Sequence, residues 1–271
     1  MPIDFTVTRL SITPVKGLSL HHPDSIDLTT QGAAGDRLFY LVDDTGRLQS
    51  CTHNAGLYGL EAAYDSETRR LEITRGDQLV VGGVIERAGV VDTDMWERRT
   101  ITSDVVADPV WSTFFSDIVG KRVQLVQARG SAYDVQPATL LGTASVTELA
   151  RRSGLSEVDS RRFRMLIEFS GGQPHIEDSW DGRLLQVGEA LLRGGGPVKR
   201  CAATTRHPDS GSVDLQTLRL ITSYRGRQDS AFGLGANFGV YADVVEPGRI
   251  SVGDSLRLRI PRQPSAPAIE S

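Results

Sequence analysis

The first part of the chain alternates between apolar and polar residues in short segments. Residues 4–12 (DFTVTRLSI) alternate and are rich in β-branched side chains, a pattern typical of a strand. Short apolar runs follow, separated by turn residues, at 25–28, 38–42, 47–51, 58–64, 70–74 and 78–81. Turn signals spaced by about ten residues favour a barrel or a sandwich over alternating strands and helices.

The second part mixes helical and strand periodicity. Residues 108–120 predict a helix, with Asp108 as its cap, Pro109 in the first turn and Gly120 at its end. A capping box of Ser145 and Glu148 predicts a helix over 145–153. Further segments are expected as helices at 158–162 and 215–224, and as strands at 121–127, 163–169, 184–188, 239–245 and 255–260. The predicted fold class is α+β and predominantly β, with the pairing of the strands left open.

Composition and charge narrow the class of protein. The chain has 271 residues, 39% hydrophobic and 24% charged, which is enough to bury a core. A net charge of -4 argues against a dedicated nucleic-acid or anionic-membrane partner. No stretch predicts a membrane-spanning helix or a signal peptide. Two widely separated cysteines are typical of a reducing compartment, so a cytoplasmic location is expected.

The stretch GGGPVKRCAATTRHPDSG, residues 194–211, holds the most reactive candidate, Cys201. The preceding Lys199 and Arg200 favour a thiolate, the form that attacks electrophiles and binds soft metals. Taken alone, the stretch fits an inert cysteine buried in a strand better, because free cysteines are among the most buried residues.

Other candidates are weaker when they are considered singly. Five basic residues lie in turns or near strand ends, and together they would line an anion pocket if the fold brought them together: Lys16, Arg37, Arg164, Lys199 and Arg200. The run from Glu177 to Trp180 is either an acid–base pair or a tight turn with Trp180 packed inward. No zinc spacing and no serine-hydrolase elbow are present.

Several motifs occur in a specific order along nearly the whole chain: PVKG (14–17), GDRLFYLVDDTGR (35–47), FR (163–164), EDSWDG (177–182), KRCAATTRHPDSG (199–211), LRLITSYR (218–225), FGVY (238–241) and PGRISVGD (247–254). In this combination the chain resembles the MOSC proteins, named for the C-terminal domain of molybdenum cofactor sulfurase. It is most similar to the subgroup with an additional N-terminal β-barrel-like domain, which includes the mitochondrial amidoxime reducing component and bacterial relatives. The resemblance implies an N-terminal domain at 1–122 and a MOSC β-barrel domain at 123–260. The last eleven residues, 261–271, are rich in Pro, Ser and Ala, which predicts a flexible tail.

The resemblance also implies a site for a molybdenum cofactor, molybdopterin. Cys201 corresponds to the thiolate ligand of the metal and to the catalytic centre. The remaining motif positions imply cofactor contacts, with the basic ones binding the anionic phosphate and pterin: Lys16, Arg37, Asp134, Arg164, Lys199, Arg200 and Tyr241.

The sequence departs from the family pattern at three places. The family reads D-T-S-P-F where Val135 and Gln136 follow Asp134 here, and F-R-P-N where Met165 and Leu166 follow Arg164. Gly17 stands where serine is frequent. Each lost hydrogen bond to a charged ligand would weaken binding by about 1.5–3 kcal/mol.

Three functions follow from the resemblance and the residues. The first is a molybdenum-dependent oxidoreductase that reduces N-hydroxylated or N-oxide small molecules. It would take electrons from separate electron-transfer proteins, because the chain has no flavin, nicotinamide or iron–sulfur fingerprint. The second is a molybdenum-independent enzyme that uses Cys201 as a sulfur carrier or nucleophile in a biosynthetic step. The third is a non-catalytic carrier of the cofactor.

Overall fold

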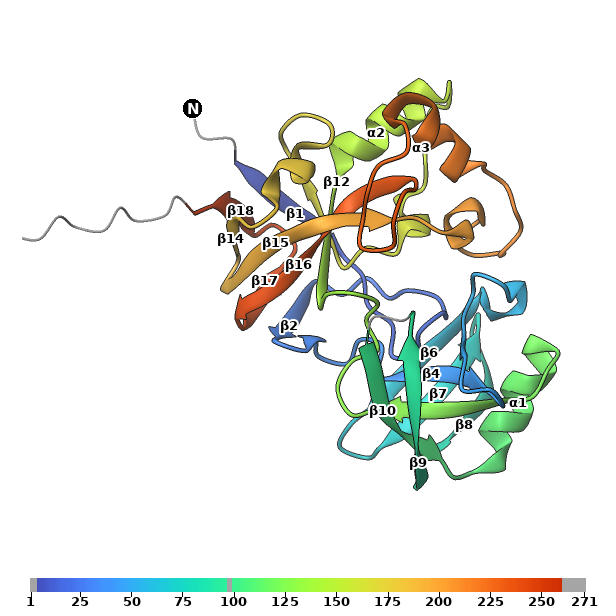
Figure 1. The fold of residues 1–271 in the computed structure, drawn as a ribbon. Helices are drawn as coiled ribbons and strands as arrows, with labels where there is room; N and C mark the ends of the chain where they lie inside the picture. The colour runs from blue at the N-terminus through green and yellow to red at the C-terminus, as the bar shows by residue number, and fades with distance from the viewer. Residues whose placement is uncertain (1–3, 97–98, 260–271) are drawn as a thin grey trace, which may run out of the picture.

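The structure is a computed structural model that describes residues 4–96 and 99–259. Its upper half in Figure 1 is a closed seven-stranded barrel with the strand order β1-β13-β12-β16-β15-β14-β18. The ring closes because β1 pairs with β13 on one side and with β18 on the other. The barrel strands are β1 (Phe5–Leu10), β12 (Ala138–Gly142), β13 (Ile167–Ser170), β14 (Leu184–Val187), β15 (Ala190–Lys199), β16 (Asn237–Glu246) and β18 (Ser255–Leu258).

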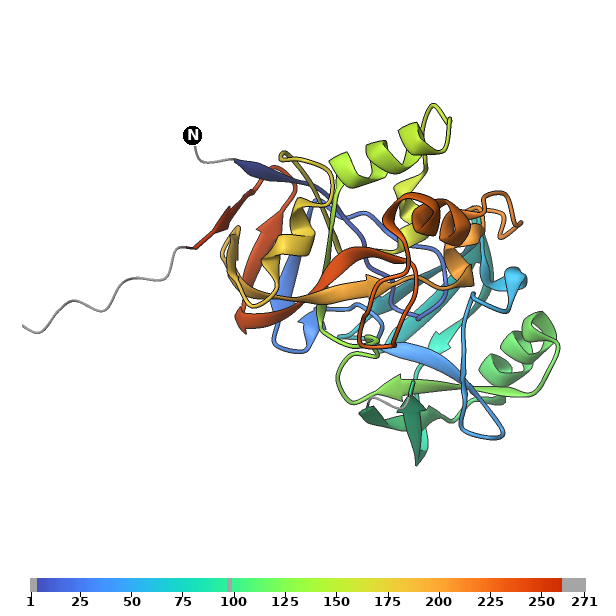
Figure 2. The same ribbon diagram turned by 45° about the horizontal axis from the view of Figure 1, so that its top comes forward.

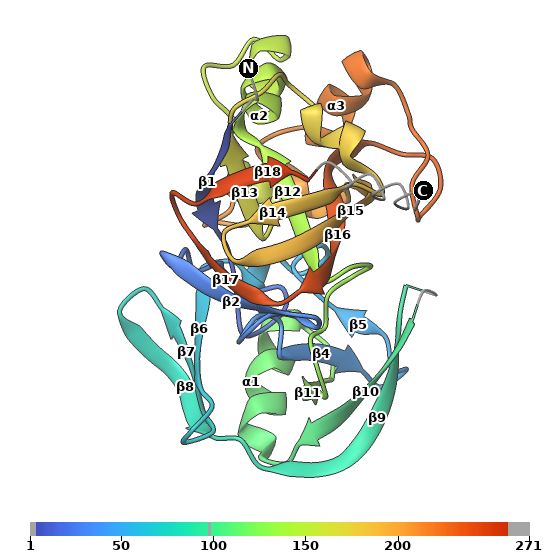
Figure 3. The same ribbon diagram turned by 90° about the vertical axis from the view of Figure 1, so that its left-hand side faces the viewer.

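The lower half contains two open sheets. One has five strands in the order β5-β4-β11-β10-β9, and the other is the meander β6-β7-β8. Their strands are β4 (Phe39–Asp43), β5 (Leu48–Gln49), β6 (Leu60–Asp65), β7 (Arg70–Arg75), β8 (Gln78–Val84), β9 (Arg87–Met95), β10 (Arg99–Val106) and β11 (Val123–Ala128). Helix α1 (Pro109–Val119) lies between the two sheets in Figure 3 and shares one core with both.

The ends of α1 agree with the sequence prediction. The side chain of Asp108 accepts a hydrogen bond from the backbone N–H of Val110, and Gly120 ends the helix in a left-handed conformation with a φ of 74°. A left-handed residue at this position is usually glycine because it has no Cβ to clash.

A small third sheet lies between the two halves, as Figure 3 shows. It has the order β17-β2-β3 and is made of β2 (Ser25–Thr29), β3 (Gly32–Ala33) and β17 (Gly248–Ser251). Both β1 and β2 therefore associate with strands from the C-terminal half of the chain. Both strands lie before the expected division at residue 122 and pair with strands that follow it, β1 with β13 and β18 and β2 with β17. The expected tail at 261–271 lies outside the described residues.

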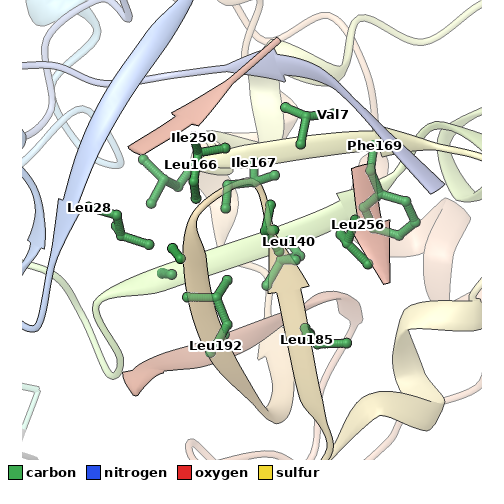
Figure 4. Packing of buried hydrophobic residues seen from close by; sticks show 14 of the residues in the cluster. Val7, Leu28, Leu140, Leu166, Ile167, Phe169, Leu185, Leu192, Ile250 and Leu256 are labelled. Atoms are coloured by element: carbon green, nitrogen blue, oxygen red, sulfur yellow. The ribbon is translucent and has the colours of Figure 1, made fainter. Parts of the chain in front are cut away.

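The barrel is filled by apolar side chains that point inward from alternate strand positions. Figure 4 shows Val7, Leu140, Leu192 and Leu256 meeting from different strands. Trp180, at the end of the 3₁₀ helix η3 (Ile176–Trp180), is fully buried beside this core. Its ring packs against Phe5 and Phe169 at centroid distances of 5.2 and 4.9 Å. The interpretation of this run as a turn with an inward tryptophan is thus correct. Truncating Trp180 to alanine would lower the free energy of unfolding by about 3–5 kcal/mol.

Two helices, α2 (Thr143–Arg152) and α3 (Thr217–Arg225), lie beside each other on the outside of the barrel (Figure 2). The predicted capping box of α2 is wrong. The helix begins after Gly142, and Ser145 is a buried residue whose hydroxyl donates to Glu177 at 2.8 Å. None of the helices in the described part of the chain is long and apolar enough to cross a membrane.

The strand predicted over 163–169 is also wrong in its first part. Residues Ser160–Phe163 form the 3₁₀ helix η2, which ends at Arg164 with a φ of 54°. The strand β13 begins only at Ile167. A left-handed residue cannot continue a strand, so the apolar run is divided between a turn and a strand.

Candidate active site

A cavity of about 500 Å³ is lined by residues from both halves of the molecule. The loop after β1, the segments flanking β4 and β5, and the connection from β11 to β12 contribute to it. The turn before β13, the end of β15 with the following 3₁₀ helix η4 (Ala202–Thr205), and β16 also line it, together with Trp96, Thr139 and Phe232. Every site residue expected from the sequence lies on this cavity: Lys16, Arg37, Asp134, Arg164, Lys199, Arg200, Cys201 and Tyr241.

Lys16 and Asp134 form an ion pair with an Nζ–Oδ1 distance of 2.6 Å. The backbone N–H of Lys16 donates to Phe39 of β4, and its Nζ also donates to the carbonyl of Ala132. Burial lowers the pKa of Lys16, and the charge of Asp134 compensates only in part. Burial opposes ionisation of Asp134, but Lys16 and a hydrogen bond from Trp96 outweigh it and lower the pKa of Asp134 to about 2.

The side chain of Arg37 is hydrogen-bonded to the backbone of Arg164. Arg37 pairs with Asp36, and its Nη2 donates to the carbonyl of Arg164 at 3.3 Å. Arg164 in turn donates from Nη2 to the carbonyl of Leu18 at 2.7 Å. Both arginines have left-handed backbones, with φ values of 50° and 54°.

This conformation is concentrated at the cavity. Five non-glycine residues in the described part of the chain have positive φ, and three of them, Arg37, Trp96 and Arg164, line the cavity. Sparsely populated backbone conformations cost about 1–3 kcal/mol each and cluster at functional sites.

Arg200 lines the cavity and is partly buried. It donates from Nη2 to the carbonyl of Phe163 and from Nη1 to the sulfur of Met165, the latter at 3.3 Å. Its Nε is buried and has no hydrogen-bond partner. Burial lowers the pKa of Arg200, which is the direction expected for a cation withdrawn from water. The neighbouring Lys199 donates to the carbonyl of Phe232 at 2.7 Å.

Cys201 is exposed and lies just past the end of β15, at the start of η4. The hydroxyl of Thr52 lies 3.7 Å from its sulfur. The expectation of an inert cysteine buried in a strand is therefore wrong for Cys201. The buried cysteine is Cys51, in the turn after β5, which also lines the cavity but is only 3% exposed.

Tyr241 lies on β16, where it pairs with Thr139 of β12 across the barrel wall. Burial raises the pKa of its phenol, so the hydroxyl stays protonated at neutral pH.

Three residues that depart from the family pattern, Gln136, Met165 and Leu166, line the cavity. Gln136 donates from Nε2 to Asp243 at 2.9 Å, and its Oε1 is buried without a partner. This amide lies against Gly195, where any Cβ would come within 2.0 Å of Oε1. Met165 and Leu166 are each 2% exposed and form part of the apolar wall.

Sequence reasoning missed Trp96 and Arg162 at this cavity. Trp96 follows β9, in a part of the chain where the pattern predicted no element. Arg162 is nearly buried and donates to the carbonyls of Thr204 and Arg206 and to Asp214. The acidic pair at Glu177 and Asp178 does not line the cavity, because Glu177 is enclosed beside α2 and Asp178 pairs with Arg225.

Comparison with known proteins identifies the family. A family model described as the MOSC N-terminal beta barrel domain matches residues 4–122, and one described as the MOSC domain matches residues 127–257.

Two mammalian relatives match over most of their length. The chain is 34% identical over 281 residues to a human protein named mitochondrial amidoxime-reducing component 1, covering 93% of this chain and 82% of the relative. It is 33% identical over 279 residues to a rat protein named mitochondrial amidoxime reducing component 2, covering 92% and 82%. A protein of Caenorhabditis briggsae named molybdenum cofactor sulfurase is 26% identical, with 93% of this chain and 36% of that protein covered. The chain thus belongs to the family of MOSC-domain proteins that carry an N-terminal MOSC β-barrel domain.

Proposed function

We propose that this chain is a molybdenum-cofactor-dependent oxidoreductase that removes the oxygen atom from N-hydroxylated or N-oxide small molecules. Cys201 is the proposed protein ligand of the metal. The observation that carries the proposal is the meeting of one exposed thiol and six lysine and arginine side chains in a single cavity. The relatives named as amidoxime-reducing components support the reaction class.

The donor set fits such a cofactor. No group of three or more His, Cys, Asp or Glu side chains in the described ranges could hold a metal ion by itself. A single thiolate is a soft ligand that needs the remaining ligands from elsewhere, and the sulfur atoms of a pterin dithiolene would provide them. A volume of about 500 Å³ lies within the usual range for small-molecule sites.

The charge of the cavity fits the anionic part of the cofactor. Lys16, Arg37, Arg164 and Arg200 line the cavity, and the buried Nε of Arg200 is a donor that still lacks an acceptor. A phosphate and a pterin offer acceptors for such groups. The apolar replacements Val135, Met165 and Leu166 remove polar contacts but add no negative charge. They would therefore weaken the binding of an anionic cofactor without repelling it.

The reaction has a simple balance. The N–O bond breaks, two electrons and two protons are consumed, and the oxygen atom leaves as water. When bound, the molybdenum cofactor would supply the two-electron redox centre for this step. The protein would hold its anionic groups through the basic side chains and keep the Cys201 sulfur directed into the cavity. A separate electron-transfer protein would deliver the electrons.

Metal and pterin analysis tests this proposal directly. Protein produced in a host that makes the cofactor should contain close to one molybdenum and one pterin per chain. Cys201→Ala should lose most of the metal, whereas Cys51→Ala, a change at the other thiol of the same cavity, should keep it. Native protein without molybdenum under these conditions would refute the proposal. Stoichiometric molybdenum without turnover of any N-oxygenated compound would instead indicate a cofactor carrier.

A second function is favoured by the missing polar contacts beside an exposed thiol. In that proposal Cys201 carries a sulfur atom as a persulfide, or attacks an electrophile, without molybdenum. Intact-mass spectrometry after incubation with a persulfide donor, which transfers its outer sulfur to the Cys201 thiolate and leaves as a thiol, should then show one added sulfur atom on native protein and none on Cys201→Ala. An unmodified thiol under turnover would exclude this function.

A further inference from the structure

Trp96 lies at the edge of the cavity with 43% of its surface exposed. It directly follows β9, so it reaches the cavity from the five-stranded sheet and not from the barrel. The other two tryptophans of the chain, Trp111 and Trp180, are fully buried. A large aromatic side chain that remains in contact with solvent beside a cavity points to a binding role.

The orientation of this indole is fixed by its neighbours. The Trp96 N–H donates to Oδ1 of Asp134 at 3.0 Å. Arg99, the first residue of β10, donates to the carbonyls of Ser131 and Tyr133 at 2.8 and 2.9 Å. Its guanidinium also covers the ring of Tyr133 at 3.6 Å from the centroid. Trp96, which follows β9, and Arg99, on β10, are thus both hydrogen-bonded to the segment 131–134.

The backbone of Trp96 is held in a conformation that a bulky residue rarely adopts, with a φ of 62°. The surrounding structure therefore holds Trp96 in a backbone conformation that is unfavourable for this residue type. A side chain that only filled space would not need such a conformation.

The indole is also close to the groups that are proposed to hold the cofactor. Oδ1 of Asp134 accepts hydrogen bonds from both Trp96 and Lys16. A substrate that reaches the cavity past Trp96 meets a flat aromatic surface that is hydrogen-bonded to the Lys16–Asp134 ion pair. The wall continues with the apolar side chains of Phe163, Met165 and Val198.

We infer that Trp96 is a stacking surface for the aromatic part of the substrate, and that the site selects aromatic N-hydroxylated compounds over aliphatic ones. This inference rests on the proposed function for the reacting group. The aromatic ring of the substrate packs offset or edge-on against the indole, and the N-oxygenated group points into the cavity.

Binding without turnover tests this inference. Benzamidoxime and acetamidoxime, which carry the same reacting group, are titrated into the full-length protein without an electron donor. Isothermal calorimetry measures the affinity, and the fluorescence of the one exposed tryptophan reports contact. Benzamidoxime should bind at least about tenfold more tightly than acetamidoxime. Trp96→Ala should weaken benzamidoxime binding by about tenfold, or about 1.4 kcal/mol, and change acetamidoxime binding by less than about twofold.

Trp96→Phe separates stacking from the hydrogen bond to Asp134, because it keeps a ring and removes the N–H. It should retain most of the affinity for benzamidoxime. Equal losses for both compounds in both variants would overturn the inference, since Trp96 would then act only through Asp134. An unchanged affinity in Trp96→Ala, or no binding of either compound, would also overturn it. If the protein binds benzamidoxime selectively but does not reduce it when an electron donor is supplied, the proposed function is refuted and this inference stands.

Discussion

The hydroxyl of Thr52 lies 3.7 Å from the sulfur of Cys201, although the two residues are 149 positions apart. Thr52 follows the buried Cys51 in the loop after β5, whereas Cys201 lies two residues beyond the end of β15. The contact joins the two halves of the molecule at the thiol. We therefore expect the reactivity of Cys201 to depend on a residue of the N-terminal half.

The first prediction concerns this contact. In protein produced without the cofactor, Cys201 should react with iodoacetamide much faster than Cys51, because only Cys201 is exposed. Thr52→Val should slow the alkylation of Cys201 by about fivefold, since a hydrogen bond worth about 1 kcal/mol to the reacting sulfur is lost. Mass spectrometry over time measures both rates. Thr205→Val is the control, because that hydroxyl donates to Ala202 at 2.7 Å. Equal slowing in both variants would contradict the role of Thr52.

The second prediction concerns the buried Arg162. Its guanidinium fastens η4 and the following loop by bonds to the carbonyls of Thr204 and Arg206 and to the carboxylate of Asp214. Arg162→Met should lower the free energy of unfolding by about 2–4 kcal/mol, because three acceptors lose a charged donor.

The adjacent Arg161 provides a matched control. Its pairs with Asp159 and Asp209 are partly exposed, so Arg161→Met should cost less than about 1 kcal/mol. Urea unfolding measures both variants. Similar losses would show that Arg162 does not fasten this loop.

The third prediction concerns the run of three glycines that leads to Cys201. A Cβ on Gly194 would lie 2.1 Å from the carbonyl oxygen of Trp180, which is backbone and cannot turn away. Gly194→Ala should therefore destabilise the protein by at least about 2 kcal/mol. A Cβ on Gly196 would meet nothing within 4 Å, so Gly196→Ala should stay within about 0.5 kcal/mol of the native protein. Thermal unfolding of the two variants gives the comparison, and equal stabilities would disprove it.

The fourth prediction is a pH dependence of stability that arises at His175. Burial, and then the neighbouring Arg225, lower the pKa of His175 to about 4. Arg225 donates to Nδ1, which suits the neutral ring, and Nε2 lies 3.2 Å from the hydroxyl of Tyr224.

Because the folded pKa is depressed, the unfolded chain takes up this proton first, at about pH 6.5. The stability that comes from a neutral His175 is full above that pH and is lost as the pH falls toward 4. The loss should be about 2 kcal/mol after allowance for solvent screening. His175→Asn should reduce the fall in unfolding free energy between pH 7 and pH 4.5, and His53→Asn, at an exposed position, should not. An unchanged slope in His175→Asn would contradict the assignment.

Local features of the chain were largely predictable. The cap of α1 at Asp108, the turn at Gly120 and the inward Trp180 all depend on residues within a few positions of one another. The boundaries failed where a buried partner from a distant segment changed a local preference. Ser145 became a buried donor to Glu177 and not a cap, and Arg164 took a left-handed conformation inside an apolar run.

The candidate site shows the same division. The order of motifs pointed to each of the eight expected residues, but spacing along the chain did not show that they share one cavity. Trp96 gave no signal, because its role depends on where β9 ends relative to the segment 131–134. The sequence around Arg162 does not distinguish it from the neighbouring arginines, because its carbonyl partners, Thr204 and Arg206, lie more than 40 positions away.

By itself, the sequence predicted many of the strands and helices, although not β9, β10 or β12. It also showed which thiol follows two cations and where the family motifs stand. Only the tertiary structure decided that β1 closes the barrel between β13 and β18, that Cys201 is open to the cavity, and that the basic residues converge on it. The physical reason is that alternation of apolar residues records which face of a strand is buried. It does not record the neighbour, because the backbone hydrogen bonds that join strands are the same for almost every side chain.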